Sequence, residues 1–147
     1  MAAEEKIVVR QVQRPQKENV DTFVSWFLKS LDLSENENAL EPGMLKEIVS
    51  ASFVGIGVTS KELNSKLDTP RTTVIYHLNR FISSGLVVRK GRKYFLRATD
   101  MESTIEEMQA DMTREFGRMM QIAEKFDQMI MGDLYGRGKG QRRNKKQ

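Results

Sequence analysis

Residues 69–87 read TPRTTVIYHLNRFISSGLV, and the fold expected for the whole chain depends mainly on these residues. Pro70 suits the first turn of a helix, because a backbone N–H would have no helical partner there. Thr69, just before it, carries a hydroxyl that can cap the helix start. Gly85 is typical of a residue that ends a helix. The stretch therefore predicts a helix over residues 70–84.

The two sides of this helix differ in chemistry. At about 100° per residue, Val74, Leu78 and Phe81 fall within a narrow apolar arc that can face a core. The opposite arc and its flanks carry hydrogen-bonding groups, methyl groups and two positive charges, on Arg71, Thr72, Thr73, Ile75, Tyr76, Asn79, Arg80 and Ser83. Such a mixture suits the base edges and phosphates of nucleic acid. We therefore expect this outer face to contact double-stranded DNA.

Two longer helices are predicted upstream. Residues 19–33 carry a broad apolar stripe at helical spacing, formed by Val20, Phe23, Val24, Phe27, Leu28 and Leu31. The second helix is predicted to begin near Pro42 and to end at Gly55 and Gly57. Its buried face is expected to consist of Met44, Leu45, Ile48, Val49 and Phe53.

A short helix is expected over residues 60–67. Thr59 and Glu62 form a capping-box pattern, in which each of the two side chains accepts a hydrogen bond from a backbone N–H. Leu63 and Leu67 are expected to point inward, and Asp68 with Thr69 forms the turn to the next helix.

After Gly85 the periodicity changes from helical spacing to two. Residues 86–98, LVVRKGRKYFLRA, predict a β-hairpin that turns at Gly91. One face of the hairpin is expected to contain Leu86, Val88, Tyr94 and Leu96, and its tip carries the cations Arg89, Lys90, Arg92 and Lys93. Four cations around one glycine favour contact with phosphate, although an inert solvated hairpin is the alternative.

Two helices joined by a tight turn and followed by a basic hairpin make a winged helix-turn-helix. The second helix of that motif enters the major groove, while the hairpin tip reaches the backbone or the minor groove. We therefore expect a mainly α fold with a small β-hairpin wing (α+β), an N-terminal helix and a long C-terminal dimerisation helix.

Charge is segregated along the chain. Residues 58–99 carry nine Lys or Arg and two Asp or Glu, whereas residues 18–57 carry two and seven, and residues 100–131 carry three and eight. The expected recognition helix and hairpin therefore lie in the most basic of these blocks, which suits nucleic-acid binding, although a solvated lysine-rich face is the alternative.

Residues 42–99 resemble the winged-helix domain of ArsR- and MarR-like prokaryotic transcription regulators, closest to the archaeal ones. The similarity lies in a helix of the type TVxxHLxxLxxxGLV, followed by a basic wing and an aromatic strand. The resemblance implies that Arg71, Thr72, Thr73, Tyr76 and Asn79 face the groove, and that Lys61, Arg80 and the hairpin cations meet phosphate. We include Ser60, beside Lys61, among the DNA-binding candidates.

For two residues of this helix, a role in packing is the alternative to contact with a ligand or with DNA. His77 projects about 60° from the centre of the apolar arc, so a half-buried histidine bonded to a backbone group is expected rather than a ligand. Tyr76 lies on the outer arc, where it contacts DNA or merely covers a neighbouring helix.

The acidic block predicts a long helix. Thr99 and Glu102 repeat the capping-box pattern, and the helix is expected to run over residues 100–131. Its apolar seam consists of Ile105, Met108, Met112, Phe116, Met119, Ala123, Phe126 and Ile130. At about 45 Å such a helix is longer than a compact domain of this size, so we expect it to pair with a second copy in a homodimer. The alternative is that it folds back on the core of its own chain.

Composition excludes several classes of site. The chain has no cysteine and one histidine, so we expect no bound metal, no metal sensing and no cofactor. No nucleophile is paired with a base and no phosphate loop is present, so we expect no enzyme activity. No apolar run reaches the roughly 18 residues of a membrane span, so no membrane partner is expected. We expect a cytoplasmic, nucleoid-associated protein whose small-molecule effector, if any, the sequence does not identify.

The predicted organisation has four parts. Residues 1–18 are expected to be a flexible N-terminus, residues 19–99 the DNA-binding domain, residues 100–131 the dimerisation helix and residues 132–147 a disordered basic tail. The leading functional hypothesis is a homodimeric, sequence-specific transcription regulator. The rival is an architectural or protein-interaction module that coats nucleic acid with little sequence preference.

Overall fold

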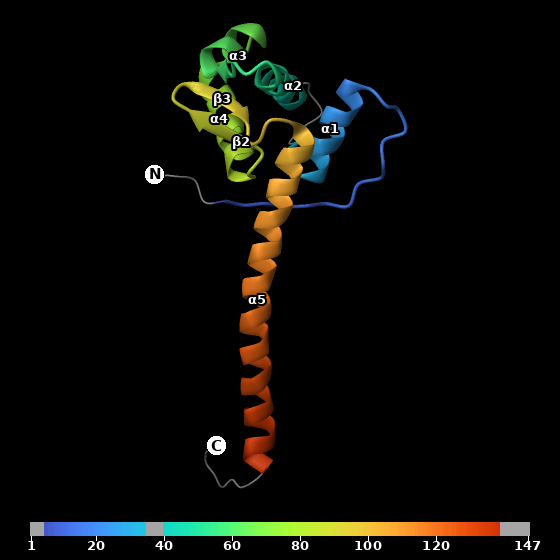
Figure 1. Cartoon of the computed structure of the whole chain (residues 1–147), viewed down its shortest axis with the longest axis vertical. Coiled ribbons are helices and arrows are strands. Elements are labelled where there is room, and N and C mark those ends of the chain that lie inside the picture. Colours follow the sequence, from blue (N-terminus) through green and yellow to red (C-terminus); the bar gives the residue numbers. More distant parts are fainter. Residues whose placement is uncertain (1–4, 35–39, 139–147) are drawn as a thin grey trace. The chain divides into compact units, whose positions relative to one another are not determined.

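The computed structural model describes residues 5–34 and 40–138 and is mainly helical, with a small antiparallel sheet and a long C-terminal helix (Figure 1). The elements in chain order are α1 (Val20–Ser30), α2 (Leu40–Phe53), β1 (Val58–Thr59), α3 (Ser60–Lys66), α4 (Arg71–Ser83), β2 (Val87–Lys90), β3 (Lys93–Leu96) and α5 (Met101–Gly138). This confirms the helical class and the long last helix. None of the described helices combines the length and apolarity needed to cross a membrane.

The chain divides into two compact units, the first ending at Met108 and the second beginning at Gln109. The core of the first unit is built from α1, α2, α3, α4, the sheet and the first turns of α5. Its fully buried side chains include Leu28, Met44, Leu45, Ile48, Leu63, Val74, Leu78, Phe81 and Leu86. The predicted inner faces of α2 and α4 are therefore confirmed at most positions.

Three apolar residues for which the sequence patterns predict burial are exposed in the structure. Phe53, expected to be buried, is 62% exposed, because α2 ends there and the chain turns through Gly55 at φ 77°. Val20 and Phe23, at the start of the α1 stripe, are 60% and 39% exposed, so only the later part of that stripe lies in the core. A helical stripe marks the apolar side but not how far along the helix its neighbours extend.

The predicted capping box at α3 is confirmed. The Glu62 carboxylate accepts a hydrogen bond from the Thr59 N–H at 2.7 Å, and the Thr59 hydroxyl accepts one from the Glu62 N–H at 3.1 Å. Thr69, in contrast, does not cap α4, because its hydroxyl donates to the carbonyl of Leu67 at 2.9 Å. Pro70 takes the cap position without a side-chain hydrogen bond.

The sheet has one strand more than the expected hairpin. The order is β1-β3-β2, with Val58 opposite Tyr94 in the added pairing. Val87 lies opposite Leu96, so Val87 and not Val88 shares the buried face with Tyr94 and Leu96. The predicted face of β2 was wrong by one residue, since a one-residue shift of register exchanges the two faces of a strand.

Close packing against the Phe95 ring of β3 requires a glycine at Gly57, just before β1. A Cβ atom at this position would lie 2.6 Å from Cζ of Phe95, and the residue has φ 67°. A residue with a side chain meets both a steric clash and an unfavourable backbone conformation there. Gly91, at the hairpin turn, has φ 65° but open space around it.

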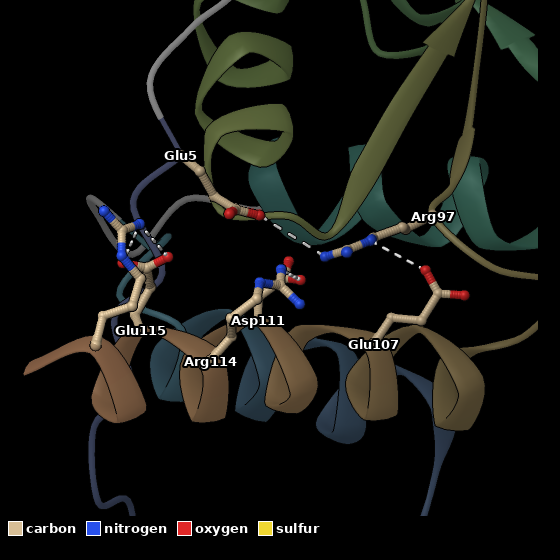
Figure 2. Close-up of polar contacts among 7 residues, drawn as sticks. Glu5, Arg97, Glu107, Asp111, Arg114 and Glu115 are labelled. Carbon is tan, nitrogen blue, oxygen red and sulfur yellow. Dashed lines mark hydrogen bonds and ion pairs between the residues drawn. The ribbon is translucent and has the colours of Figure 1, made fainter. Parts of the chain in front are cut away.

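The N-terminal segment, expected to be flexible, makes backbone hydrogen bonds to the rest of the first unit in its described part. The Lys6 N–H donates to the carbonyl of Ser83 at 2.7 Å, and the Arg10 N–H donates to that of Ser30 at 2.7 Å. Figure 2 shows the Arg97 guanidinium between two carboxylates: Nε lies 3.1 Å from Glu107, and Nη1 lies 3.8 Å from Glu5.

Helix α5 differs from its prediction at both ends. Asp100, not Thr99, supplies the side-chain cap, because its carboxylate accepts from the Ser103 N–H at 2.7 Å. At the other end the helix continues to Gly138, so residues 132–138 are helical and do not belong to a tail. Glycine weakens a helix by about 1 kcal/mol but does not end it as proline does. The expected disorder of residues 139–147 lies outside the described residues.

The predicted seam of α5 divides between the two units. Met108 is 3% exposed and belongs to the core of the first unit, and Ile105 packs against that core. The folding-back alternative therefore holds for these two residues. In the second unit Phe116, Met119, Phe126 and Ile130 are exposed, at 41–61%. Short ion pairs, such as Arg114 with Asp111 at 2.6 Å, lie along this part of the helix.

Candidate nucleic-acid interface

Helices α3 and α4 are joined by a tight turn, which the side chain of Asn64 holds by donating to the Thr69 carbonyl. Asp68 takes a left-handed conformation in this turn, with φ 48°. Aspartate tolerates that region better than most residues, because its short side chain bonds locally. The turn therefore fixes the direction in which α4 leaves α3.

The outward side of α4 is the one that the sequence predicted. Arg71, Thr72 and Asn79 are exposed, Tyr76 is 51% exposed, and Thr73 is half-buried. No acidic residue lies in the first turn of α4. The helix start therefore combines the positive end of the helix dipole with Arg71, without a nearby carboxylate in that turn.

Arg80 has a structural role that the sequence did not reveal. Its guanidinium donates to the backbone carbonyls of Asp32 at 3.1 Å and Leu33 at 3.3 Å, just beyond the end of α1. It also lies 6.0 Å from the centre of the Tyr76 ring, at the edge of cation–π range. Because these contacts hold the guanidinium, Arg80 positions α4 and Tyr76 against the rest of the unit.

His77 is more deeply buried than expected, at 4% exposure, and its neighbour is a carboxylate and not a backbone group. Its Nδ1 lies 3.9 Å from Oε2 of Glu41, which is fully buried in α2. The Tyr76 ring packs edge-on against the imidazole, with centroids 5.1 Å apart. Glu41 was missed, although its spacing from Met44, Leu45 and Ile48 places it on the buried face of α2.

The four hairpin cations are all exposed, but they differ in their contacts. Arg89 donates to the Gly91 carbonyl at 2.8 Å and lies 5.7 Å from the Tyr94 ring centre. Lys90 lies 5.3 Å from the Phe95 ring centre. Arg92 lies at the turn and makes no hydrogen bond or ion pair within the described part of the chain.

Lys93 lies near the start of α3, since Thr59 pairs with it across β1 and β3. Its charge contributes to lowering the pKa of Glu62, but the hydrogen bond from the Thr59 backbone is the main cause. Lys93 therefore faces a carboxylate that stays ionised near neutral pH, so part of its positive potential is offset.

Of the two DNA contacts predicted at the start of α3, Lys61 is accessible and Ser60 is not. Lys61 is exposed, so its ammonium group is accessible. Ser60 is only 7% exposed and cannot present its side chain to a groove, which is a correction to the predicted set. The first position of α3 follows directly on β1, and this places Ser60 against the core.

In residues 5–34 and 40–138 no three His, Asp or Glu side chains gather as metal ligands. Comparison of the chain with protein-family models, curated proteins and solved structures finds no match. A functional assignment for the α4 and hairpin surface therefore depends on its own geometry and charge.

Proposed function

We propose that this chain is a sequence-specific double-stranded DNA-binding transcription regulator that acts as a homodimer. Its first unit is a winged helix-turn-helix in which α3 and α4 form the helix pair and β2 with β3 forms the wing. Helix α4 enters the major groove, and the hairpin tip contacts the backbone or the minor groove.

The observation that carries this proposal is the pairing of an uncharged, hydrogen-bonding helix face with a cationic hairpin. Thr72, Tyr76 and Asn79 are exposed on α4, where Arg71 adds charge. A major groove about 12 Å wide admits one helix, and donors, acceptors and methyl groups are what its base edges recognise. Arg92 and Lys90 at the hairpin supply sequence-independent phosphate affinity.

The exposed apolar face of α5 supports the proposed dimer. Phe116, Met119 and Phe126 lie in water when the chain is alone. Monomeric soluble proteins rarely expose a contiguous apolar patch larger than about a few hundred Å². A second copy that covers it brings two α4 helices together, and successive major grooves on one side of DNA are about 34 Å apart.

The experiment is to select bound fragments from random-sequence DNA and then to measure affinity against salt. The proposal predicts an enriched, palindromic site and an affinity that falls with increasing salt. Equal affinity for selected and random DNA supports the architectural alternative. Absence of DNA binding at low salt contradicts both.

A further inference from the structure

The apolar face of α5 is wider than a two-stranded coiled coil uses. From Met112 onward the seam follows one heptad register, in which Phe116, Ala123 and Ile130 occupy position a and Met119 and Phe126 occupy position d. Three of the flanking positions are also apolar: Met120 is at position e, and Ile122 and Met129 are at position g. The exposed fractions of Met120, Ile122 and Met129 are 66%, 65% and 70%.

Projection of residues 116–131 at about 100° per residue shows the extent of this face. Large or small apolar residues occupy an arc of about 200°, with Asp127 the only exception inside it. The rest of the circumference contains Gly117, Arg118, Gln121, Glu124, Lys125 and Gln128. Apolar residues at a and d alone suit a two-stranded seam, whereas a wider face suits the core of a helix bundle.

We propose that residues 116–131 pack into a four-helix bundle made by four copies of this chain, which joins two of the homodimers proposed above. The consequence of this bundle for DNA binding rests on the proposed function, whereas the packing of the four helices does not. In the bundle, positions a and d face the centre, and the e and g edges face the adjacent helices instead of water.

The exposed area agrees with this packing. Eight large apolar side chains on the arc are 41–70% exposed: Phe116, Met119, Met120, Ile122, Phe126, Met129, Ile130 and Met131. At roughly 100 Å² of exposed area each, they offer about 800 Å² per chain, which is the contribution of one partner to a stable interface between two copies. The area therefore favours association, and the width of the apolar arc favours four helices over two. A two-stranded pair leaves much of the e and g share of this area in water.

The edges of the apolar face carry no charge pattern that would select a foreign helix. Partner choice in coiled coils is commonly set by opposite charges at e and g. Here Met120, Ile122 and Met129 occupy such positions, and Asp127 is the only charged residue at e or g between residues 116 and 131. Symmetric association of identical chains is also the commonest form of assembly in soluble proteins.

Such a tetramer can bind a second DNA duplex. A tetramer contains four copies of α4 and its hairpin, and a homodimeric regulator uses two of them on one site. Four copies therefore suffice to hold two DNA segments at once.

The test is the mass of the full chain at micromolar concentration, measured by light scattering and by sedimentation. A protomer of 16.9 kDa predicts a tetramer of about 68 kDa (four times 16.9). The double variant Ile122→Lys with Met129→Lys charges only the g edge and is expected to halve the mass while circular dichroism shows unchanged helicity. Gln121→Lys with Gln128→Lys, on the polar side, is the matched control and should keep the tetramer.

A wild-type mass of one or two chains overturns the inference. So does a tetramer whose mass is unchanged by the g-edge variant, because another surface then holds it together. Capture of a fluorescent random-sequence duplex by an immobilised duplex, dependent on the wild-type protein and abolished in the g-edge variant, supports the bridging consequence.

The two proposals fail in different ways. A dimer that binds DNA contradicts the four-helix bundle and leaves the proposed function intact. A tetramer that responds to the g-edge variant but binds no DNA contradicts the proposed function and leaves the bundle intact.

Discussion

The Glu41 carboxylate in α2 lies beside the His77 imidazole in α4, with Oε2 3.9 Å from Nδ1 and both side chains buried. At 3.9 Å the two groups are within ion-pair distance, but His77 Nδ1 makes no hydrogen bond there, and a buried polar group without a hydrogen bond costs free energy. The pair joins α2 to the inner side of the proposed reading helix, one residue away from the exposed Tyr76.

We expect the two residues to be energetically coupled. Removal of one member of a buried polar pair leaves the other without its neighbour, so Glu41→Leu and His77→Leu should each cost about 2–5 kcal/mol of unfolding free energy. The double variant should cost less than the sum of the two, with a coupling of about 0.5–3 kcal/mol. Urea denaturation of the four proteins measures this cycle. If the costs of the two single variants simply add in the double variant, the two side chains at 3.9 Å do not stabilise one another.

The two halves of the α5 seam should respond differently to substitution. Met108 is buried in the first unit, so Met108→Ala should lower its unfolding free energy by about 2–5 kcal/mol without changing the assembly. Phe126 is exposed in the single chain, so Phe126→Asp should reduce the assembly to monomers and leave the first unit folded. Light scattering and thermal melting separate the two effects. Gln128→Asp, on the polar side, is the control for Phe126→Asp, and an unchanged mass for Phe126→Asp would exclude the seam as the interface.

Two glycines with similar backbone conformations should differ in their tolerance of alanine. Gly91→Ala meets open space, so its cost is the backbone conformation alone, about 1–2 kcal/mol. Gly57→Ala adds a clash with the Phe95 ring and should cost more. Thermal melting of both variants is the measurement. Equal melting temperatures would mean that the Phe95 ring moves aside at little cost.

The capping box predicts a pH dependence of stability. Hydrogen bonding from Thr59 holds the pKa of Glu62 below its ordinary value. The contribution of Glu62 is therefore fully present above the unfolded pKa of about 4.3, and it is lost as pH falls through the lower folded pKa. Glu62→Gln keeps an acceptor but cannot ionise, so the stability gap between wild type and variant should shrink between pH 7 and about pH 3. A gap of the same size at both pH values in urea denaturation would contradict the role of the charge.

The sequence predicted those parts of the fold that depend on local patterns. The inner face of α4, the Thr59 and Glu62 capping box and the turn at Gly91 follow from helical spacing and from residues with strong positional preferences. Each of these involves residues close together in the chain.

Features that depend on partners distant in sequence were missed. Strand β1 is only two residues long and exists through its pairing with β3. The contacts of Arg80 with the carbonyls of Asp32 and Leu33 join segments 47 or more residues apart. The face of β2 was misassigned, because a run of consecutive apolar residues around Val87 has no alternation to fix the register.

The candidate site shows the same division. The outward residues of α4 were found from its helical projection, and the hairpin cations from their position around one glycine. The burial of Ser60 depends on how α3 meets the sheet, and the proximity of Lys93 to Glu62 depends on strand pairing. Neither arrangement follows from residue spacing along the chain.

In the proposed function α4 reads sequence while the hairpin supplies general affinity, and these two roles predict different mutational signatures. Removal of one base-reading side chain by Tyr76→Ala or Asn79→Ala should cost about 1–3 kcal/mol on the selected site and little on random DNA. Lys90→Ala with Arg92→Ala should weaken binding to both DNAs and reduce the salt slope by about one unit for each phosphate that is no longer neutralised.

The most direct measurement is the affinity of these variants for the selected site and for random DNA, after thermal melting has shown each to be folded. We expect the ratio of the two affinities to fall for Tyr76→Ala and Asn79→Ala and to be largely kept for Lys90→Ala with Arg92→Ala. Equal reductions in affinity for both DNAs in the folded α4 variants would contradict this expectation, because α4 would then not be the element that reads sequence.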